Sequence, residues 1–232
     1  MTSSHTQLAF NLERESLYAQ EDFFRGVSND RAFQAIIEKK AWGKACGQLL
    51  VGPSGSGKTH LARIWQELNH GIFLNLPHCL EEGKEHLESA QKGVAFILDD
   101  FPGNVLEQDV FHLYNLVCEH QGALLILSQT LPQEWPLVLL DLKSRLYSLP
   151  LQTLETPDDE VLRAVLRKRF ADFQIAVPEN VISYVLPRME RSFKSVQDFA
   201  RRLNMETLAQ KKNATLTMAR ACLEHLRNKS ID

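Results

Sequence analysis

The feature that most constrains this chain is a glycine-rich run that lies between an apolar segment and an amphipathic one. Residues 52–59 read GPSGSGKT, which matches the pattern GxxxxGK[ST]. Residues 49–51 before it are apolar, as in a buried strand, and apolar side chains recur after it at helical spacing, at Leu61, Ile64, Trp65 and Leu68. A strand, a glycine-rich turn and a helix in this order predict a phosphate-binding loop.

The residue types in this loop suit a nucleotide. Glycines allow consecutive backbone N–H groups to turn toward phosphate oxygens, and the following helix adds its positive end. We expect Lys58 to reach the β and γ phosphates and the Thr59 hydroxyl to bind Mg²⁺. The alternative is a glycine-rich turn without a ligand. The predicted cofactor-binding run is Pro53, Ser54, Gly55, Ser56, Gly57, Lys58, Thr59 and His60.

Two carboxylates follow a second apolar run. Residues 94–98 read VAFIL and lead into Asp99 and Asp100, which places both acids at the carboxyl edge of the predicted sheet, where phosphates bind. We expect Asp99 to hold Mg²⁺ through water and Asp100 to orient an attacking water molecule. A solvated turn is the alternative interpretation.

Other polar side chains are candidates for sensing the phosphates. Gln129 follows the apolar run 123–127, so it is expected at the same edge, although an ordinary loop would look similar. Arg145 precedes a predicted strand over residues 146–151; an unpaired surface charge is the alternative for it. Arg191 and Lys194 begin a later helix, from which they could fold over a nucleotide.

The pattern of apolar residues divides the chain. Short apolar runs alternate with helical stripes, which predicts a parallel α/β sheet with strands at residues 48–51, 72–76, 94–98, 123–127 and 146–151. After Glu155 only helical patterns remain, and Thr156 as cap with Pro157 in the first turn marks the expected helix start. We therefore predict a flexible arm over residues 1–20, an α/β domain over 21–154 and a helical lid over 155–232.

Composition narrows the class of protein. The formal net charge of −3 gives no general electrostatic reason for DNA binding, although residues 155–232 carry 14 basic against 11 acidic side chains. The four cysteines show no CxxC spacing, so we expect buried thiols rather than disulfides or zinc ligands. No apolar run reaches the ~20 residues of a membrane span, and no leader pattern opens the sequence. A cytoplasmic protein is expected.

Several segments together resemble a known family. The runs GPSGSGKTHLA, FILDD, LSQTLP and LKSRL, followed by helical patterns, resemble the AAA+ module of the bacterial replication initiator DnaA over residues 22–228. The resemblance implies a P-loop AAA+ fold, with a five-stranded parallel sheet, flanking helices and a small all-helical lid. Residues 22–24 and 27–29 resemble the segment that wraps the adenine ring in that family. ADP or ATP with Mg²⁺ is therefore the implied cofactor, with Val27 as an adenine contact.

Two further likenesses refine the implied function. DnaA continues beyond its lid into a DNA-reading domain, whereas this sequence stops a few residues after the last predicted helix, so the chain is similar to the Hda family of regulators that switch DnaA off. Residues 7–12 look like the hexapeptide with which that family docks on the sliding clamp. A polar site would take Gln7, and an apolar groove would take Leu8, Phe10 and Leu12.

The resemblance also implies a role for Arg145 and limits the catalysis expected of the chain. The family's arginine finger carries over to Arg145, which would act in trans on ATP bound to a neighbouring DnaA. Lys194 stands where DnaA relatives carry a sensor arginine, with Arg191 one turn earlier, and Gln129 replaces an acid common there. Lysine lacks the planar fork of arginine, so we expect weak or no intrinsic ATPase activity.

The leading hypothesis is regulatory inactivation of DnaA by an adenine-nucleotide-bound AAA+ protein that is tethered to the DNA-loaded sliding clamp and stimulates hydrolysis of DnaA-bound ATP. Its implied partners are DnaA and the sliding clamp, the β subunit of DNA polymerase III. DNA would be contacted only through the clamp, and no membrane is implied. Self-association into a homo-oligomer stays open. The alternative is a DnaA-related adaptor or helicase loader that does not promote hydrolysis, and a small P-loop kinase ranks third.

Overall fold

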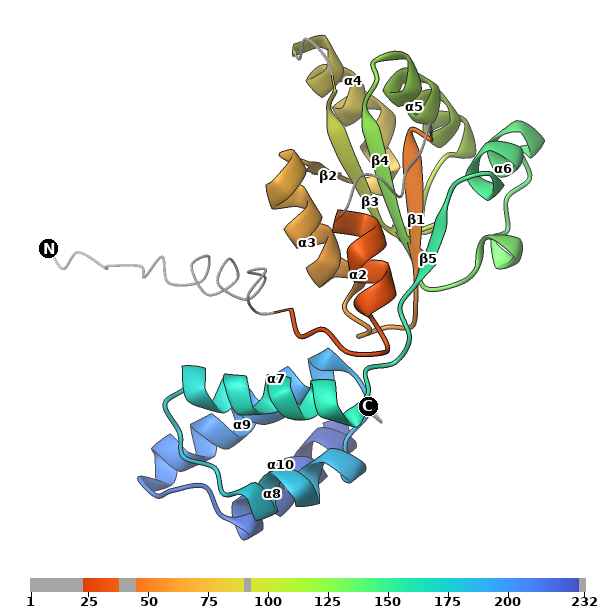
Figure 1. The fold of residues 1–232 in the computed structure, drawn as a ribbon. Helices are drawn as coiled ribbons and strands as arrows, with labels where there is room; N and C mark the ends of the chain where they lie inside the picture. Colours follow the sequence, from red (N-terminus) through yellow and green to blue (C-terminus); the bar gives the residue numbers. More distant parts are fainter. Residues whose placement is uncertain (1–22, 38–44, 90–92, 230–232) are drawn as a thin grey trace, which may run out of the picture.

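The computed structural model describes residues 23–37, 45–89 and 93–229, which form an α/β unit and a helical bundle (Figure 1). The strands are β1 (Gly47–Val51), β2 (Ile72–Leu74), β3 (Ala95–Phe101), β4 (Ala123–Ser128) and β5 (Leu151–Thr153). The helices of the α/β unit are α2 (Asp30–Ile37), α3 (Lys58–Asn69), α4 (Cys79–Ser89), α5 (Glu107–Glu119) and α6 (Leu140–Tyr147), with short 3₁₀ turns η3 (Leu76–His78) and η4 (Pro132–Glu134). The bundle comprises α7 (Asp159–Asp172), α8 (Glu179–Val185), η5 (Leu186–Arg188), α9 (Phe193–Gln210) and α10 (Leu216–Lys229).

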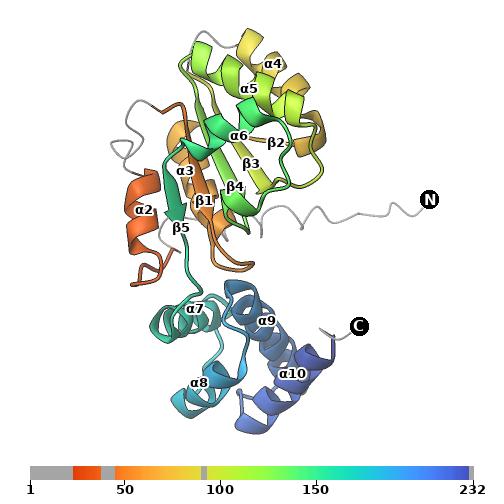
Figure 2. The same ribbon diagram turned by 90° about the vertical axis from the view of Figure 1, so that its right-hand side faces the viewer.

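The five strands form one parallel sheet, as the sequence predicts, and their order is β2-β3-β4-β1-β5. From β1 the chain crosses to the β2 edge and then returns through β3 and β4 to β5. Right-handed crossovers therefore put α3 on one face of the sheet and α4, α5 and α6 on the other (Figure 2). The carboxyl ends of β1, β3 and β4 all lie at the edge that faces the helical bundle (Figure 1).

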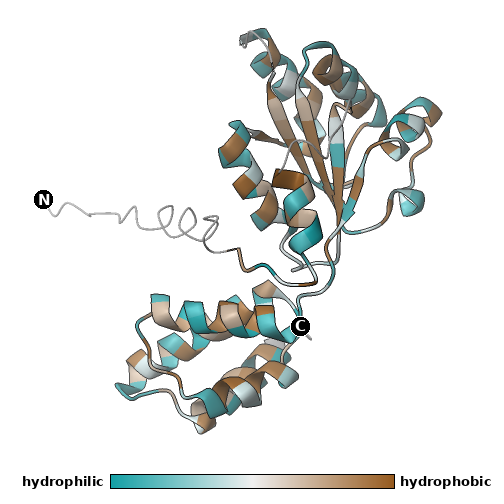
Figure 3. Ribbon diagram, in the orientation of Figure 1, coloured by the Kyte–Doolittle hydropathy of each residue, from teal (hydrophilic) through white to brown (hydrophobic). Residues whose placement is uncertain are grey.

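Burial of both faces explains why the strands are so apolar. Every residue of β1 is buried, and alternation sends Leu49 into the core under α4–α6 and Leu50 into the core under α2 and α3. The inner strands are accordingly among the most hydrophobic segments of the ribbon, whereas the edge strand β5 and the helices carry hydrophilic residues as well (Figure 3). Trp65 of α3 is fully buried with Ile36 of α2 in the second of these cores.

Three predicted element boundaries are wrong. Residues 146–151 are not one strand, because 140–147 form α6, which buries Leu142 and Leu146 one turn apart, and β5 begins only at residue 151. Strand β3 continues past Leu98, so both acids lie within it. Helix α7 begins at Asp159, two residues after Pro157. Its cap is Asp158 rather than Thr156, because the Asp158 carboxylate accepts a hydrogen bond from the Val161 N–H at 2.8 Å.

The helical bundle has a hydrophobic core of its own. Helices α7 to α10 bury a set of apolar side chains against one another, and Phe24 from the amino-terminal side packs against that set. Two hydrogen bonds at Ser28 link the helical bundle to the α/β unit. The Ser28 hydroxyl donates to the Asp158 carboxylate at 3.3 Å, and the Glu155 N–H donates to the Ser28 carbonyl. The edge of the sheet that carries residues 52–59, hereafter the nucleotide loop, is thereby held next to the bundle.

The cysteines depart in part from expectation. Cys46 and Cys118 are joined by a disulfide, which corrects the prediction of four free thiols: the loop before β1 and the last turn of α5 bring these two residues together, with their Cα atoms 5.3 Å apart. Cys79 and Cys222 are free and buried, as predicted. In the parts of the chain that the structure describes, no helix combines the length and the apolar character needed to cross a bilayer.

Candidate nucleotide-binding site

The loop between β1 and α3 has the backbone shape that its glycines allow. Gly55 and Gly57 take φ values of +72° and +98°, in the left-handed region that glycine tolerates without steric cost. Helix α3 begins immediately afterwards at Lys58, so its amino-terminal N–H groups point into the loop. The combination is a concave surface of backbone donors that suits an anion.

Lys58 is folded into this loop and buried, with 8% of its surface exposed. Its Nζ donates to the carbonyl oxygens of Gly52 at 2.7 Å and Pro53 at 2.9 Å. Burial lowers the pKa of Lys58 below its usual value, although the negative charges of Asp99 and Asp100 act in the opposite direction. The loop therefore holds a desolvated ammonium group next to two carboxylates, where a phosphate group would stabilise its charge.

The paired acids lie at an irregularity in β3. The register between β3 and β4 shifts between Leu98 and Phe101, and Asp100 has a φ of +59°, which breaks the regular alternation of the strand. Asp99 accepts a hydrogen bond from the Thr59 hydroxyl at 3.0 Å. Asp100 accepts one from the Gln129 amide at the end of β4, also at 3.0 Å. The structure thus brings these four predicted site residues into one chain of contacts.

The helical bundle touches the same loop. The Phe193 N–H at the start of α9 donates to the Gly55 carbonyl at 3.0 Å. Space is tight, since a Cβ atom on Gly55 would lie 2.5 Å from the Cβ of Ser192, and one on Gly57 would lie 3.0 Å from the Phe193 ring. The sequence analysis did not identify Ser192 and Phe193. The available signal was the helix cap, because Ser192 stands three residues before Ser195, whose N–H it accepts.

Aromatic side chains border the loop on the amino-terminal side. The Phe23 ring lies edge-on to His60, with centroids 5.3 Å apart, and tilted against Phe33 at 5.1 Å. Asn29 is buried and fixes the segment between them, because its side chain bonds the Gly26 N–H and the Phe24 carbonyl. Val27, in contrast, is 97% exposed.

Three predicted cations make no recorded contact with the loop, although Arg191 and Lys194 flank Ser192 and Phe193, which touch Gly55. Arg145 is exposed on α6, on the opposite face of the sheet from α3. Arg191 bonds the Asp159 carboxylate at 2.5 Å, within the bundle. Lys194 is exposed and lines a pocket on the bundle. None of their recorded contacts involves the nucleotide loop. The predicted clamp-binding residues Gln7, Leu8, Phe10 and Leu12 lie outside the described residues.

The donor set suits a nucleotide phosphate with Mg²⁺. The Ser56 hydroxyl oxygen is buried without a hydrogen-bond partner in the described part of the chain, so it offers an unused polar group inside the loop. The Thr59 hydroxyl and the Asp99 carboxylate supply two adjacent oxygen donors, and Mg²⁺ is commonly held by one or two protein ligands together with substrate phosphates. The residues would bind and orient the phosphates, while the ion would neutralise their charge.

The chain is similar in sequence to the replication initiator DnaA of several bacteria. No family model matches the chain. It is 24% identical to the chromosomal replication initiator protein DnaA of Geobacter sulfurreducens over 231 residues, which cover 90% of this chain. A DnaA from a Thermotoga strain is 26% identical over 202 residues. The chain spans about half the length of these relatives, 52% and 46% respectively.

Comparison with solved structures establishes the fold. Domain III of Thermotoga maritima DnaA superimposes with a TM-score of 0.74 at 21% identity, covering 90% of this chain and 96% of that domain. A RuvB mutant from the same genus superimposes with a TM-score of 0.70 at 16% identity, covering 91% of this chain and 73% of RuvB. The chain therefore has the α/β P-loop AAA+ fold that the resemblance implied, and it is related to the DnaA AAA+ module.

Proposed function

We propose that this chain is an adenine-nucleotide-bound regulator of DnaA, which stimulates hydrolysis of DnaA-bound ATP and is tethered to the DNA-loaded sliding clamp. The likeness to DnaA supports a role connected with replication initiation. The observation that carries the finer proposal is the position of Arg145. A guanidinium that faces away from the chain's own nucleotide loop can serve the nucleotide of another molecule.

The nucleotide in this proposal is ADP or ATP with Mg²⁺. One of the similar structures is DnaA from Aquifex aeolicus bound to AMPPCP, an ATP analogue, at 18% identity and a TM-score of 0.64. Lys58, the loop N–H groups and Thr59 would hold the phosphates, and Asp99 would bind Mg²⁺ through water. Asp100 would orient water, although its bond to the Gln129 amide keeps both groups engaged with each other. Low turnover in the chain's own site is consistent with this arrangement.

The surroundings of Arg145 fit an exposed finger. Its guanidinium lies over the Phe111 ring at 5.0 Å and the Tyr114 ring at 5.7 Å, both on α5. Within the described ranges it has no ion-pair partner, so its charge is not neutralised by the protein. A cation held on two aromatic faces keeps its N–H donors free for phosphate oxygens. This arrangement supports a role in trans on a partner's nucleotide.

The proposal is tested by hydrolysis of ATP bound to DnaA, with clamp loaded on DNA and this chain added. Arg145→Ala should bind nucleotide and clamp normally and lose the stimulation by about 10³-fold if the finger is worth what such arginines supply elsewhere. The matched control is Lys143→Ala on the same helix, whose ammonium lies over the Tyr147 ring. Stimulation by Arg145→Ala equal to that of the unaltered chain would contradict the assignment.

Changes in residues 7–12 distinguish this proposed function from that of a DnaA-related adaptor. Gln7→Ala, or deletion of residues 1–12, should abolish retention on the DNA-loaded clamp under the proposal and have no effect on an adaptor that binds through its AAA+ surface. Retention should also require clamp, so DNA alone should not hold the chain. Under the proposal the protein acts in the bacterial cytoplasm, near the nucleoid, through the clamp.

The two predicted phosphate sensors on the helical bundle, Arg191 and Lys194, carry less of the proposal than Arg145. Arg191 is engaged by Asp159, so in the described arrangement it is a structural ion pair, while Lys194 is unpaired within the described residues. We treat residues 21–154 as the AAA+ base and 155–232 as its lid, and we assign the closest lid contact with the nucleotide loop to the start of α9. Both cations flank this contact in the sequence, and no contact of either with the loop is recorded among the described residues.

A further inference from the structure

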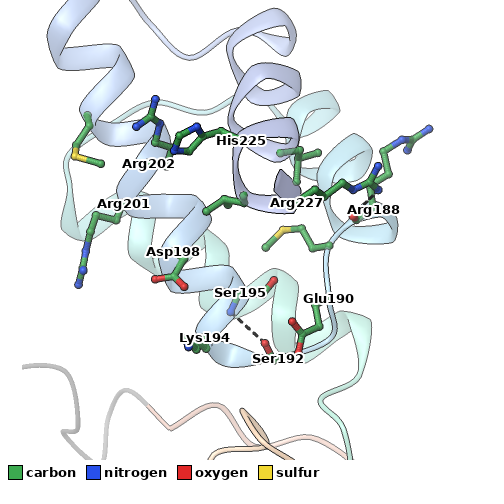
Figure 4. A pocket seen from close by; sticks show the side chains of 14 residues that line it. Arg188, Glu190, Ser192, Lys194, Ser195, Asp198, Arg201, Arg202, His225 and Arg227 are labelled. Carbon is green, nitrogen blue, oxygen red and sulfur yellow. Dashed lines mark hydrogen bonds between the residues drawn. The ribbon is translucent and has the colours of Figure 1, made fainter. Parts of the chain in front are cut away.

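A pocket of about 680 Å³ lies on the helical bundle, and the proposed function assigns no ligand to it. Ser192, which lies against Gly55 of the nucleotide loop, is one of its lining residues. Its walls come from the segment around η5, from α9 and from α10 (Figure 4). The volume falls within the roughly 300–1,000 Å³ that is typical of ligand sites. Five of its lining residues are cationic and two are acidic: Arg188, Lys194, Arg201, Arg202 and Arg227, with Glu190 and Asp198.

The cations differ in how much charge they can offer a ligand. Arg202 is paired with Glu206 at 2.8 Å, although its Nε is buried without a hydrogen-bond partner among the described residues. Arg227 donates to the Arg188 carbonyl at 3.1 Å. Lys194 and Arg201 are both exposed and, within the described residues, have no ion-pair partner.

The labelled groups surround the pocket rather than line one side of it. Figure 4 shows Arg202 beside His225 at one end, Arg188 beside Arg227 at another, and Arg201 projecting outward from α9. Positive charge is therefore spread around the opening, and the two cations that have no ion-pair partner within the described residues, Lys194 and Arg201, both lie on α9. Such an arrangement attracts an anionic segment and orients it along the bundle.

The remaining lining residues decide the class of anion. Met189, Met205, Leu223 and Leu226 also line the pocket, and Met205 is 49% exposed. Methionine side chains adapt to varied apolar partners. Single-stranded nucleic acid is commonly bound by stacking on several aromatic rings, whereas the lining residues that the structure describes include one ring, the imidazole of His225, and no Phe, Tyr or Trp.

The two carboxylates of the pocket also favour a peptide over a nucleic acid. Glu190 and Asp198 would repel a chain of phosphates, whereas a peptide backbone brings N–H donors that these carboxylates can accept. We infer that the pocket is a docking site for an acidic protein segment that also carries an apolar side chain, supplied by a separate partner protein. The positive charges would hold its carboxylates, and the methionine and leucine wall would hold its apolar group.

Binding of short fluorescent peptides to the full chain by anisotropy tests this inference. The probe is a peptide of Asp, Glu and Leu, compared with one in which Ser replaces Leu, one in which Lys replaces the acids, and an oligothymidylate. The first peptide should bind most tightly. Arg201→Glu and Met205→Asp should each weaken it by about tenfold or more, and added salt should weaken it further in the unaltered chain.

The controls use exposed positions so that folding is preserved. Lys212→Glu reverses a charge on the same bundle outside the pocket and should change the peptide affinity by less than about twofold. The affinity for ADP should be the same in Arg201→Glu as in the unaltered chain, which shows that the variant is folded and that the pocket is separate from the nucleotide site.

Three results would overturn the inference. Tighter binding of oligothymidylate, lost in Arg201→Glu, would make the pocket a nucleic-acid site. Equal binding of the Ser-substituted peptide would mean that charge alone is recognised. The third concerns residues 1–22, which contain Glu13, Glu15, Glu21 and Asp22. A rise in peptide affinity on deleting these residues would make the chain's own amino-terminal segment the occupant, in place of a separate protein.

Discussion

Burial of Lys58 brings little stability to the free protein but prepares its ammonium group to bind an anion. The ammonium group is desolvated and satisfied by two backbone carbonyls of its own loop. A buried cation of this kind contributes little to stability by itself, because desolvation offsets its hydrogen bonds. Its charge makes a favourable contribution to the free energy of binding when an anion binds next to it.

Lys58→Met should therefore separate stability from ligand binding. We expect the free energy of unfolding without nucleotide to change by no more than about 1 kcal/mol, because the charge and its desolvation are removed together. The stabilisation by ADP and Mg²⁺, about 2.7 kcal/mol at a hundred times the dissociation constant, should disappear. Thermal unfolding with and without ADP checks both statements. Full stabilisation of the variant by ADP would show that the nucleotide binds elsewhere.

Cys79 provides a pH-dependent prediction at the same scale. Burial raises the pKa of the Cys79 thiol from 9.0 to about 11, with the nearby Asp109 charge adding to the effect. Between these two values the unfolded chain loses the thiol proton and the folded chain keeps it. The folded state binds more protons there, so the contribution of this group to stability is present below pH 9 and falls as pH rises toward 11.

Alkylation followed by mass spectrometry tests the burial that raises the pKa of the Cys79 thiol. At pH 8 Cys79 should stay unmodified in the folded protein and react fully in denaturant, because the thiolate is the reactive form. Rapid alkylation of Cys79 in the folded protein at pH 8 would show that the side chain is not enclosed as described.

At the scale of elements, the nucleotide loop and the start of α9 form one unit. The bond from the Phe193 N–H to the Gly55 carbonyl and the close approach of Ser192 leave no room for a side chain at residue 55. The helical bundle is therefore positioned by the loop itself as well as by the hydrogen bond between Ser28 and Asp158. Movement of the bundle would change the backbone that is expected to hold phosphates.

Gly55→Ala tests this coupling. The added Cβ would lie 2.5 Å from the Ser192 Cβ, at a φ of +72° that disfavours any side chain, so we expect a loss of roughly 1–3 kcal/mol in unfolding free energy. Adding Ser192→Gly removes the contact but not the φ penalty, so the double variant should recover part of the loss. Urea titrations of both variants measure this. Equal stabilities for the single and double variants would exclude a steric contact.

The elements also show where the sequence is informative. The strands β1, β3 and β4 follow from apolar runs, because a sheet covered on both faces has little tolerance for polar residues. Residues 146–151 misled the prediction because α6 is short and buries only Leu142 and Leu146, so its apolar pattern runs into that of β5. The contact of Ser192 with Gly55 joins residues far apart in the sequence, and no local pattern encodes it.

On the scale of the whole molecule, the candidate groups divide between two surfaces. The nucleotide loop, the paired acids and Gln129 meet at the carboxyl edge of the sheet, as their positions after predicted strands indicated. Arg145 lies on α6, on the face of the sheet opposite α3. Sequence spacing could not reveal this position because it depends on the crossover that contains α6. Under the proposed function, the molecule presents a site for its own nucleotide and a separate arginine for a partner.

This division makes the location of the hydrolysed nucleotide the central question. DnaA would be loaded with radiolabelled ATP and this chain with unlabelled ADP, in the presence of clamp on DNA, and release of labelled phosphate would be followed. The account predicts an acceleration of about 10³-fold over DnaA alone, absent with Arg145→Ala. No acceleration, or accelerated release only when the label is carried by this chain instead of DnaA, would contradict it.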